Sequence, residues 1–363
     1  MAKSITLDTK KLPTLSCCMI VKNEEDNLKR LLPLLKACMD ELIIVDTGST
    51  DGTKEVIKQY TDNVYDFEWC DNFSAARNES LKHATKDYII WMDADDSISK
   101  QDVARLKFHL QKNPNTGVFV TLIDKRPSKE FQSIQLRVFP NVPGVKFIGK
   151  VHEQVSFSVE ELGIKYSHCA IPVIHLGYDT EDNVRKKLER NIAILEQEIA
   201  ENGNDFLSNL HLAKTYLGVG KIDKAIPYSK KALELVHDIE ISNENAFMAY
   251  MTECTILSVR GQSREALLLM EKAKEIFPDN KILKLTLSEM YFRERRYKEA
   301  YKELLFIKTD MLGLGLLPID TKDVAKVMMQ LLIVAALAVG DFDTVEHCIS
   351  KLYNDPNYKV YRG

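Results

Sequence analysis

The strongest constraint on the fold comes from one short stretch, Tyr88–Ser97, in which an apolar run of strand length ends in three aspartates, Asp93, Asp95 and Asp96. Carboxylates this close repel one another and resist burial, so the cluster is easiest to keep where a hard divalent cation bridges it to an anionic group. Open α/β sheets bind ligands just past the ends of their strands. The alternative is an acidic turn that caps a helix beginning near Lys100.

The first half of the chain alternates strand and helix patterns. Strands are expected at Leu15–Val21, Glu41–Asp46, Asn63–Phe67 and Lys86–Met92, with helices between them. This alternation predicts a parallel, doubly wound sheet with right-handed crossovers. Beyond residue 114 the pattern changes, and further strands joined by short turns are expected at Gly117–Asp124, Gln132–Phe139, Val145–Val151 and Ile164–His175.

Composition excludes several classes of protein. A length of 363 residues favours two domains, and a net charge of -4 without a long Lys/Arg run does not favour a nucleic-acid partner. We expect no transmembrane segment, because no run of about 18 apolar residues occurs. Met1–Lys11 has no apolar signal region. The seven cysteines have no paired spacing, so we expect reduced thiols in a cytoplasmic protein.

Polar residues follow the second strand. Asp46 leads into a loop of small residues that ends at Thr53, and neither the Gly-x-Gly-x-x-Gly nor the Walker pattern is present. Asp46 could bond a base or ribose, and the small side chains would let a nucleotide lie close. The alternative role for this loop is a helix N-cap supplied by Ser49, Thr50 or Asp51, and the two roles do not exclude each other.

Two later segments carry further candidates. Arg77 lies one to two turns into the helix that follows Asp71, where an arginine could reach a pyrophosphate or a base. His152 and Glu153 close a strand pattern and could supply a general base, and His175 could complete a metal shell. The alternatives are a solvated helix face for the arginine and structural or exposed positions for the histidines.

Together these segments resemble the family 2 glycosyltransferases of the GT-A fold. The matching series is Val21–Glu24, Val45–Asp51, Asp71–Asn78, Asp93–Asp96 and Gly149–Glu153, within residues 13–180. The segments Phe-Ser-Ala-Ala-Arg-Asn, Gly-Lys-Val-His-Glu and His-Leu-Gly-Tyr are similar to those of sublancin-type peptide S-glycosyltransferases and of related bacterial enzymes with helical-repeat tails. The resemblance implies a Rossmann-like domain that binds a nucleotide diphosphate sugar.

The resemblance also implies roles on the donor side. Asp46 would recognise the base, and Arg77 would bind the uracil or diphosphate end of the donor. Asp93, Ala94 and Asp95 would form the Asp-x-Asp motif against the donor diphosphate. UDP-glucose or UDP-N-acetylglucosamine would be the donor.

At the reacting end, the resemblance implies that Asp93 and Asp95 hold Mn²⁺ or Mg²⁺ together with His175. Glu153 falls where inverting members of the family place the catalytic base. It would deprotonate the acceptor as the acceptor attacks the anomeric carbon.

From about Asn183 the sequence becomes helical, and a set of small residues recurs. Ala213, Gly220, Ala225 and Ala232 return as Cys254, Gly261, Ala266 and Ala273, and in part as Ser288, Arg295 and Ala300. The last pair of copies has the 34-residue period of tetratricopeptide (TPR) repeats, which this region resembles. A fourth, degenerate unit is expected in Lys326–Tyr353. The alternative is an irregular helical bundle.

The sequence therefore predicts an α/β GT-A domain in residues 1–180 and an all-α, TPR-like repeat domain in residues 181–363. The expected activity is transfer of a hexose to a Cys, Ser or Thr side chain of a peptide or protein, as in bacteriocin S-glycosylation. The repeats would bind that acceptor or a second subunit in a homodimer. One alternative is a glycosyltransferase of the cell envelope or a surface polysaccharide, and another is a TPR scaffold that carries an inactive transferase domain.

Overall fold

The computed structural model describes residues 11–125, 130–176, 181–202, 205–236, 243–305, 307 and 321–354. These residues form two compact units, one reaching to Leu195 and the other beginning at Glu196. The division falls within helix α6 (Glu181–Asn202). Each unit is described by itself below.

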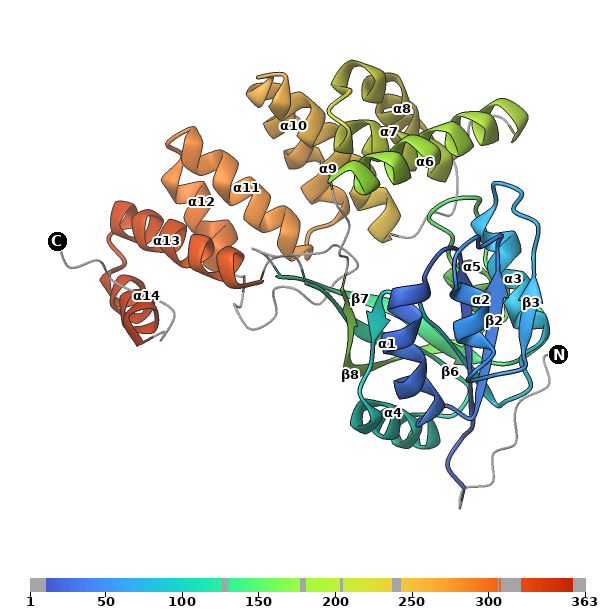
Figure 1. Ribbon diagram of the computed structural model, residues 1–363. Helices are drawn as coiled ribbons and strands as arrows, with labels where there is room; N and C mark the ends of the chain where they lie inside the picture. The colour runs from blue at the N-terminus through green and yellow to red at the C-terminus, as the bar shows by residue number, and fades with distance from the viewer. Residues whose placement is uncertain are drawn as a thin grey trace. The chain divides into compact units, whose positions relative to one another are not determined.

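The first unit is built on an eight-stranded sheet (Figure 1). In spatial order its strands are β3 (Val64–Asp66), β2 (Glu41–Asp46), β1 (Leu15–Val21), β4 (Tyr88–Trp91), β7 (Glu130–Pro140), β6 (Thr116–Lys125), β8 (Lys165–His175) and β5 (Asp96–Ser97). The first four strands are parallel to one another, as predicted. β7 is antiparallel to both β4 and β6, so the parallel order predicted for the first half of the chain ends at β4, before the segment where the sequence pattern changes. Too few residues separate β6 from β7 for a parallel crossover.

Helices cover both faces of this sheet. One apolar core joins the sheet to α1 (Glu25–Lys36), α2 (Thr53–Ile57) and α4 (Lys100–Lys112). The second core contains side chains of α3 (Phe73–Lys82) and α5 (Ser156–Glu161). Neighbouring strand residues divide between the two cores because strand side chains alternate in direction. The sheet is therefore buried on both sides, and ligands can reach the parallel strands only at their ends.

One predicted strand is wrong. Val145–Val151 is not a strand: the only pairing in this stretch is the isolated bridge between Ile148 and Gln154. Its backbone bonds to side chains instead, since Phe147 donates its N–H to Asn78 and accepts a hydrogen bond from the same amide. An apolar pattern alone cannot distinguish such an anchored loop from a buried strand.

The second unit consists of helix pairs. After the end of α6 come α7 (Phe206–Gly218) with α8 (Ile222–Leu235), α9 (Asn243–Val259) with α10 (Ser263–Ile276), α11 (Lys281–Arg293) with α12 (Tyr297–Leu305), and α13 (Thr321–Val339) with α14 (Phe342–Asn354). The recurring small residues of the first three pairs, apart from those at the turns, are buried, which lets the paired helices approach closely. The predicted fourth unit corresponds to α13 and α14.

The turn inside each pair needs one residue in the left-handed backbone region. Gly220, Gly261 and Gly340 take this role with φ values of 74°, 75° and 81°. Arg295 has the same place in the third pair with φ of 59°. A left-handed residue commonly ends a helix, and glycine does so without a steric penalty. The recurring positions in the sequence are therefore the turns of a helical repeat.

The sequence predicts no transmembrane segment and reduced cysteines. No helix within the described ranges has the length and apolar character needed to cross a membrane. All seven cysteines are free, and five of them are buried. Gly177 and Tyr178, the end of the predicted His-x-Gly-Tyr segment, lie outside the described residues.

A partly buried lysine in α7 gives a prediction about stability. Lys214 makes no ion pair with any described residue, and burial lowers its pKa from 10.5 to about 8. Charged Lys214 therefore weakens the folded state at neutral pH, and wild type regains this stability as pH rises from about 8 to 10.5. Lys214→Met should raise the free energy of unfolding at pH 7 by about 1 kcal/mol. Chemical denaturation at pH 7 and pH 10 should show that the gain shrinks at the higher pH.

The exposed Lys230 on α8 provides the control for this measurement. Lys230→Met removes the same charge without relieving burial and should change stability little at either pH. An equal gain from both substitutions would contradict the effect assigned to burial of Lys214.

Candidate active site

The loops that follow β1 and β2 form one wall of a candidate site. Asn23 accepts a hydrogen bond from the Thr50 backbone N–H at 2.8 Å, and its own N–H donates to Ser49 Oγ at 2.9 Å. The Glu24 N–H donates to Thr53 Oγ1 at 2.8 Å. Because these two parallel strands end at the same edge of the sheet, the hydrogen bonds fix the two loops as a single surface.

Asp46 ends β2 and is buried below this surface, with 1% of its area exposed. Its Oδ1 accepts hydrogen bonds from the backbone N–H groups of Gly48 and Ser49 at 3.0 and 2.9 Å. Its Oδ2 is buried and has no hydrogen-bond partner among the described residues. Buried polar atoms are nearly always bonded, so this oxygen has the character of an acceptor for a ligand N–H or O–H.

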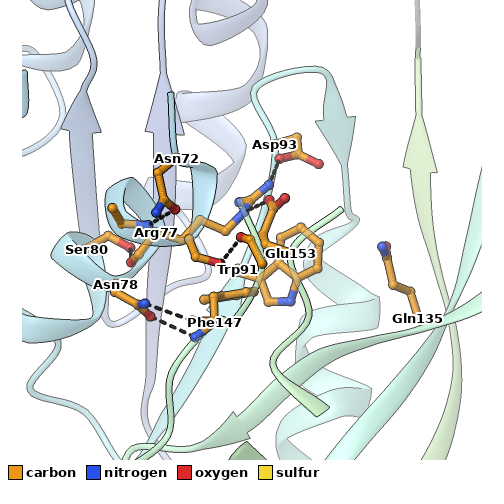
Figure 2. A network of polar contacts seen from close by, with 12 residues as sticks. Asn72, Arg77, Asn78, Ser80, Trp91, Asp93, Gln135, Phe147 and Glu153 are labelled. Carbon is orange, nitrogen blue, oxygen red and sulfur yellow. Dashed lines mark hydrogen bonds and ion pairs between the residues drawn. The ribbon is translucent and has the colours of Figure 1, made fainter. Parts of the chain in front are cut away.

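Arg77 does not lie on a solvated helix face. It is 7% exposed, and its guanidinium lies between two carboxylates, as Figure 2 shows. Nε donates to Glu153 Oε1 at 2.5 Å, and NH2 donates to Asp93 Oδ1 at 2.8 Å. The guanidinium also packs over the ring of Trp91, 4.3 Å from its centroid. One arginine therefore connects the aspartate cluster to the predicted catalytic base.

Glu153 reaches this arginine because its turn is tied to the start of α3. Gly149 adopts φ of 99°, which turns the chain, and its carbonyl accepts a hydrogen bond from Ser74 Oγ at 2.6 Å. The Phe73 N–H donates to the Lys150 carbonyl at 2.9 Å. These bonds hold the Gly-Lys-Val-His-Glu segment against the helix that carries Arg77.

A second buried arginine, Arg137 on β7, joins the same cluster of charges and is not among the residues that the sequence predicts for the site. It is 2% exposed, and its NH1 donates to Asp96 Oδ2 at 3.0 Å. Its NH2 lies 3.5 Å from Asp93 Oδ2, and the guanidinium stands 3.7 Å from the centroid of Trp91. An arginine within the apolar run Leu-Arg-Val-Phe was the available signal, because arginine is rarely buried unless it is paired.

The third group is Asp95, Asp96 and His175. His175 Nδ1 lies 3.0 Å from Asp96 Oδ1, and its Nε2 lies 3.4 Å from Asp95 Oδ2. The pairing of β5 with β8 places Asp96 opposite His175. One ligand atom from each residue lies within 4.8 Å of the others, so the three could hold one metal ion.

Charges within the site shift several pKa values. Burial, reinforced by the charges of Asp93 and Asp96, raises the pKa of Asp95 to about 6. The hydrogen bond to Asp96, and then the charges of the three aspartates, raise the pKa of His175 to about 9. Burial opposes ionisation of Asp93, but Arg77 and Arg137 together hold its pKa well below its usual value.

Two carboxylates and an imidazole are a donor set that suits Mn²⁺, and carboxylates suit Mg²⁺. Asp93, Asp95, Asp96 and Glu153 contribute four negative charges, against Arg77, Arg137 and a protonated His175. The net charge of these seven side chains is negative, and it becomes more negative when His175 loses its proton to act as a ligand. The site therefore fits a divalent cation.

The structure gathers most of the predicted site residues. Arg77, Asp93 and Glu153 are joined directly, and Asp95 and His175 adjoin them through Asp96. Ala94 is buried between the aspartates of its motif, and Asp46 lies at the end of β2, which β1 separates from β4. Asp93 is turned toward the two arginines, while Asp96 stands next to His175.

Two parts of the chain match models of known protein families. Residues 16–169 match the model of glycosyl transferase family 2, and residues 266–309 match YpiA-like tetratricopeptide repeats. The N-terminal domain belongs to glycosyl transferase family 2. The predicted arrangement of a GT-A domain followed by TPR-like repeats is confirmed.

Individual relatives extend across both parts of the chain. The SPbeta prophage-derived glycosyltransferase SunS of Bacillus subtilis is 28% identical over 73% of this chain and 64% of its own length. A TPR repeat-containing protein of Synechococcus elongatus is 30% identical over 60% of this chain and 56% of its own. The chain thus spans less than two thirds of either relative.

Among solved structures, S. aureus TarS 1-349 in complex with UDP-GlcNAc aligns with a TM-score of 0.42 at 14% identity. The alignment covers 70% of this chain and 86% of that one.

The role of Arg137 gives a prediction about stability. Arg137→Met would leave Asp93 with one cationic partner fewer and the fully buried Asp96 without its arginine. The free energy of unfolding should fall by about 3–5 kcal/mol, as for other broken buried ion pairs. Arg105→Met should change it by less than about 1 kcal/mol, because Arg105 pairs with Asp102 while 62% of its side chain is exposed. Denaturant titration of both variants tests the contrast, and equal losses would contradict it.

Proposed function

We propose that this protein is an inverting, metal-dependent glycosyltransferase that moves a hexose from a UDP-sugar onto a Cys, Ser or Thr side chain of a peptide or protein. The observation that carries the proposal is the ion-paired connection from Glu153 through Arg77 to Asp93. It links a candidate base to a candidate metal site at the rim of a family 2 domain.

In this proposal the donor lies along the edge formed by β2 and β4. The unpartnered oxygen of Asp46 accepts a hydrogen bond from the base of the nucleotide. Ala94 contributes backbone close to the diphosphate. Arg77 keeps the carboxylates of Asp93 and Glu153 at a fixed separation beside the diphosphate, rather than binding the uracil.

Asp95 and His175, with Asp93 or Asp96 beside them, would hold Mn²⁺ or Mg²⁺. When bound, the cation would offset the charge that develops on the leaving nucleoside diphosphate. Asp96 holds His175 through Nδ1, so Nε2, which lies 3.4 Å from Asp95 Oδ2, would face the ion together with that carboxylate. Arg137 holds Asp96 in position for this task through the hydrogen bond to its Oδ2.

Glu153 would act as the base. Its Oε1 is held by Arg77, so its other oxygen can accept the proton of the acceptor thiol or hydroxyl. Attack from the face opposite the leaving group would invert the anomeric centre. The peptide acceptor is supported by the resemblance to sublancin-type S-glycosyltransferases and by the repeat unit, which offers an extended surface.

Two further elements belong to the same proposal. Cytoplasmic location is supported by the seven free cysteines, since disulfides rarely persist in that compartment. The repeat unit would bind the acceptor or a second subunit.

The metal assignment is tested by hydrolysis of UDP-glucose and UDP-N-acetylglucosamine in the presence of Mn²⁺ or Mg²⁺. Wild type should release UDP only with the cation, and EDTA should stop the release. Asp95→Ala should lose at least about 100-fold in rate, because it removes a ligand from the cation. Asp26→Ala is the control, since this side chain is fully exposed on α1. Metal-independent hydrolysis, or equal rates in both variants, would contradict the assignment.

The role of Glu153 is tested with Glu153→Gln. The amide is nearly the same size and can still accept the hydrogen bond from Arg77, so UDP and Mn²⁺ should bind as in wild type. Transfer to a Cys-, Ser- or Thr-containing peptide should fall by about 10²–10⁴-fold, the usual contribution of a general base. Calorimetry of UDP binding and mass spectrometry of the peptide measure the two effects. Parallel loss of binding and transfer would remove the assignment as base.

A further inference from the structure

An arginine and two aromatic side chains lie together at the start of α3 without a role in the chemistry above. The guanidinium carbon of Arg190, on α6, lies 4.9 Å from the ring centroid of Phe73. Trp69 packs edge-on against the same ring, with centroids 4.8 Å apart. Phe73 is the first residue of α3, the helix that carries Arg77. We call Trp69, Phe73 and Arg190 the outer platform.

The outer platform is held rigidly next to the catalytic segment. Trp69 Nε1 donates to Asp71 Oδ1 at 2.8 Å, and Asp71 adopts the left-handed φ of 53°. Asn72 then caps α3 by accepting a hydrogen bond from the Ala75 N–H at 2.9 Å. The Phe73 N–H donates to the carbonyl of Lys150, three residues before Glu153. A ligand that rests on the platform would therefore keep a defined distance from the base.

The guanidinium of Arg190 has hydrogen-bond donors available to a ligand. Its guanidinium bonds to the side-chain oxygen of its neighbour Asn191, and it forms no ion pair with any residue in the described part of the chain. Arg190 is exposed, and its partial burial lowers its pKa, although Asp71 and Glu153 act in the opposite direction. A partly desolvated guanidinium without a carboxylate is an anion-binding group, because it can donate two parallel hydrogen bonds.

Arg190 adjoins the catalytic segment through Phe73, whose N–H bonds to the Lys150 carbonyl three residues before Glu153. Among the described carboxylates, Asp71 and Glu153 influence its charge. The donor diphosphate and cation belong with the aspartate cluster in the proposed mechanism. An anionic group close to Glu153 would be repelled by its carboxylate, and Arg190 offers the compensating charge.

We propose that the outer platform is an acceptor subsite in which Arg190 binds the carboxylate of an Asp or Glu that flanks the modified residue. Phe73 and Trp69 support the adjoining part of the peptide. This inference rests on the proposed peptide acceptor and adds the class of peptide that the site selects, namely one with an acidic flank.

The test measures preference within each variant, so that a change in overall activity or folding cancels. Matched peptides Ac-Gly-X-Cys-X-Gly-amide, with X as Glu, Gln or Lys, and their Ser counterparts are incubated with UDP-glucose or UDP-N-acetylglucosamine and Mn²⁺. Wild type should favour Glu over Lys by about tenfold in kcat/KM, mainly through KM. Arg190→Gln should abolish the preference, and Arg190→Glu should reverse it in favour of Lys.

Arg185→Glu provides the matched control. Arg185 lies on the same helix, pairs with Glu189 at 3.0 Å, and is 75% exposed. The same charge reversal there should leave the wild-type preference in place. An absence of flank preference in wild type, or a reversal by Arg185→Glu as large as that by Arg190→Glu, would overturn the proposal.

A separate readout distinguishes this proposal from the proposed function. Binding of the Glu- and Lys-flanked peptides is followed by tryptophan fluorescence, and the Trp69→Phe variant isolates the signal of Trp69 from that of Trp91. If metal-dependent hydrolysis occurs but no peptide is modified, the peptide acceptor fails as a function. Arg190-dependent binding of the acidic peptide would still support the subsite, and equal binding of the two peptides would overturn it.

Discussion

The site depends on one shared ion pair: the carboxylate of Asp93 lies between the guanidinium groups of Arg77 and Arg137. The two arginines also pack over the same indole, that of Trp91, at 4.3 and 3.7 Å. Three acidic residues in four positions could not otherwise be folded at a sheet edge, since uncompensated buried charges are strongly destabilising. The two arginines compensate the negative charge of the cluster. In addition, Arg77 orients Glu153 and Arg137 orients Asp96.

The mixed sheet explains why these residues meet. Parallel strands deliver Asp46 and the aspartate cluster to one edge, but neither Arg137 nor His175 comes from those strands. They come from β7 and β8, on the other side of β4. The antiparallel pairing of β7 with β4 brings Arg137 beside Trp91, and the pairing of β5 with β8 brings His175 to Asp96. The strands on the far side of β4 from the parallel strands therefore complete the site.

Sequence patterns predicted much of this arrangement and missed what depends on long-range pairing. β1 and β2 match their predicted bounds, because a buried parallel strand is a continuous apolar run with clear ends. The burial of Arg77 could not be predicted, since nothing local to α3 reveals that Asp93 and Glu153 approach it. Arg137 was missed for the same reason. Val145–Val151 was misread because its backbone partners are the side chains of distant residues, Asn78 among them.

Some cationic side chains near Glu153 form ion pairs within the chain and one does not. This difference indicates which of them can select a substrate. Arg77, Arg137 and His175 are all held by carboxylates of the same chain, so their positions are set before any ligand arrives. Such preorganised charges serve a group that is the same in every turnover, as a nucleotide diphosphate would be. Arg190 packs on Phe73, outside this network, and forms no ion pair with a carboxylate in the described structure. An unpaired cation gains most from a ligand that supplies the missing anion, so the variable partner, the acceptor, is the one that the arginine can select.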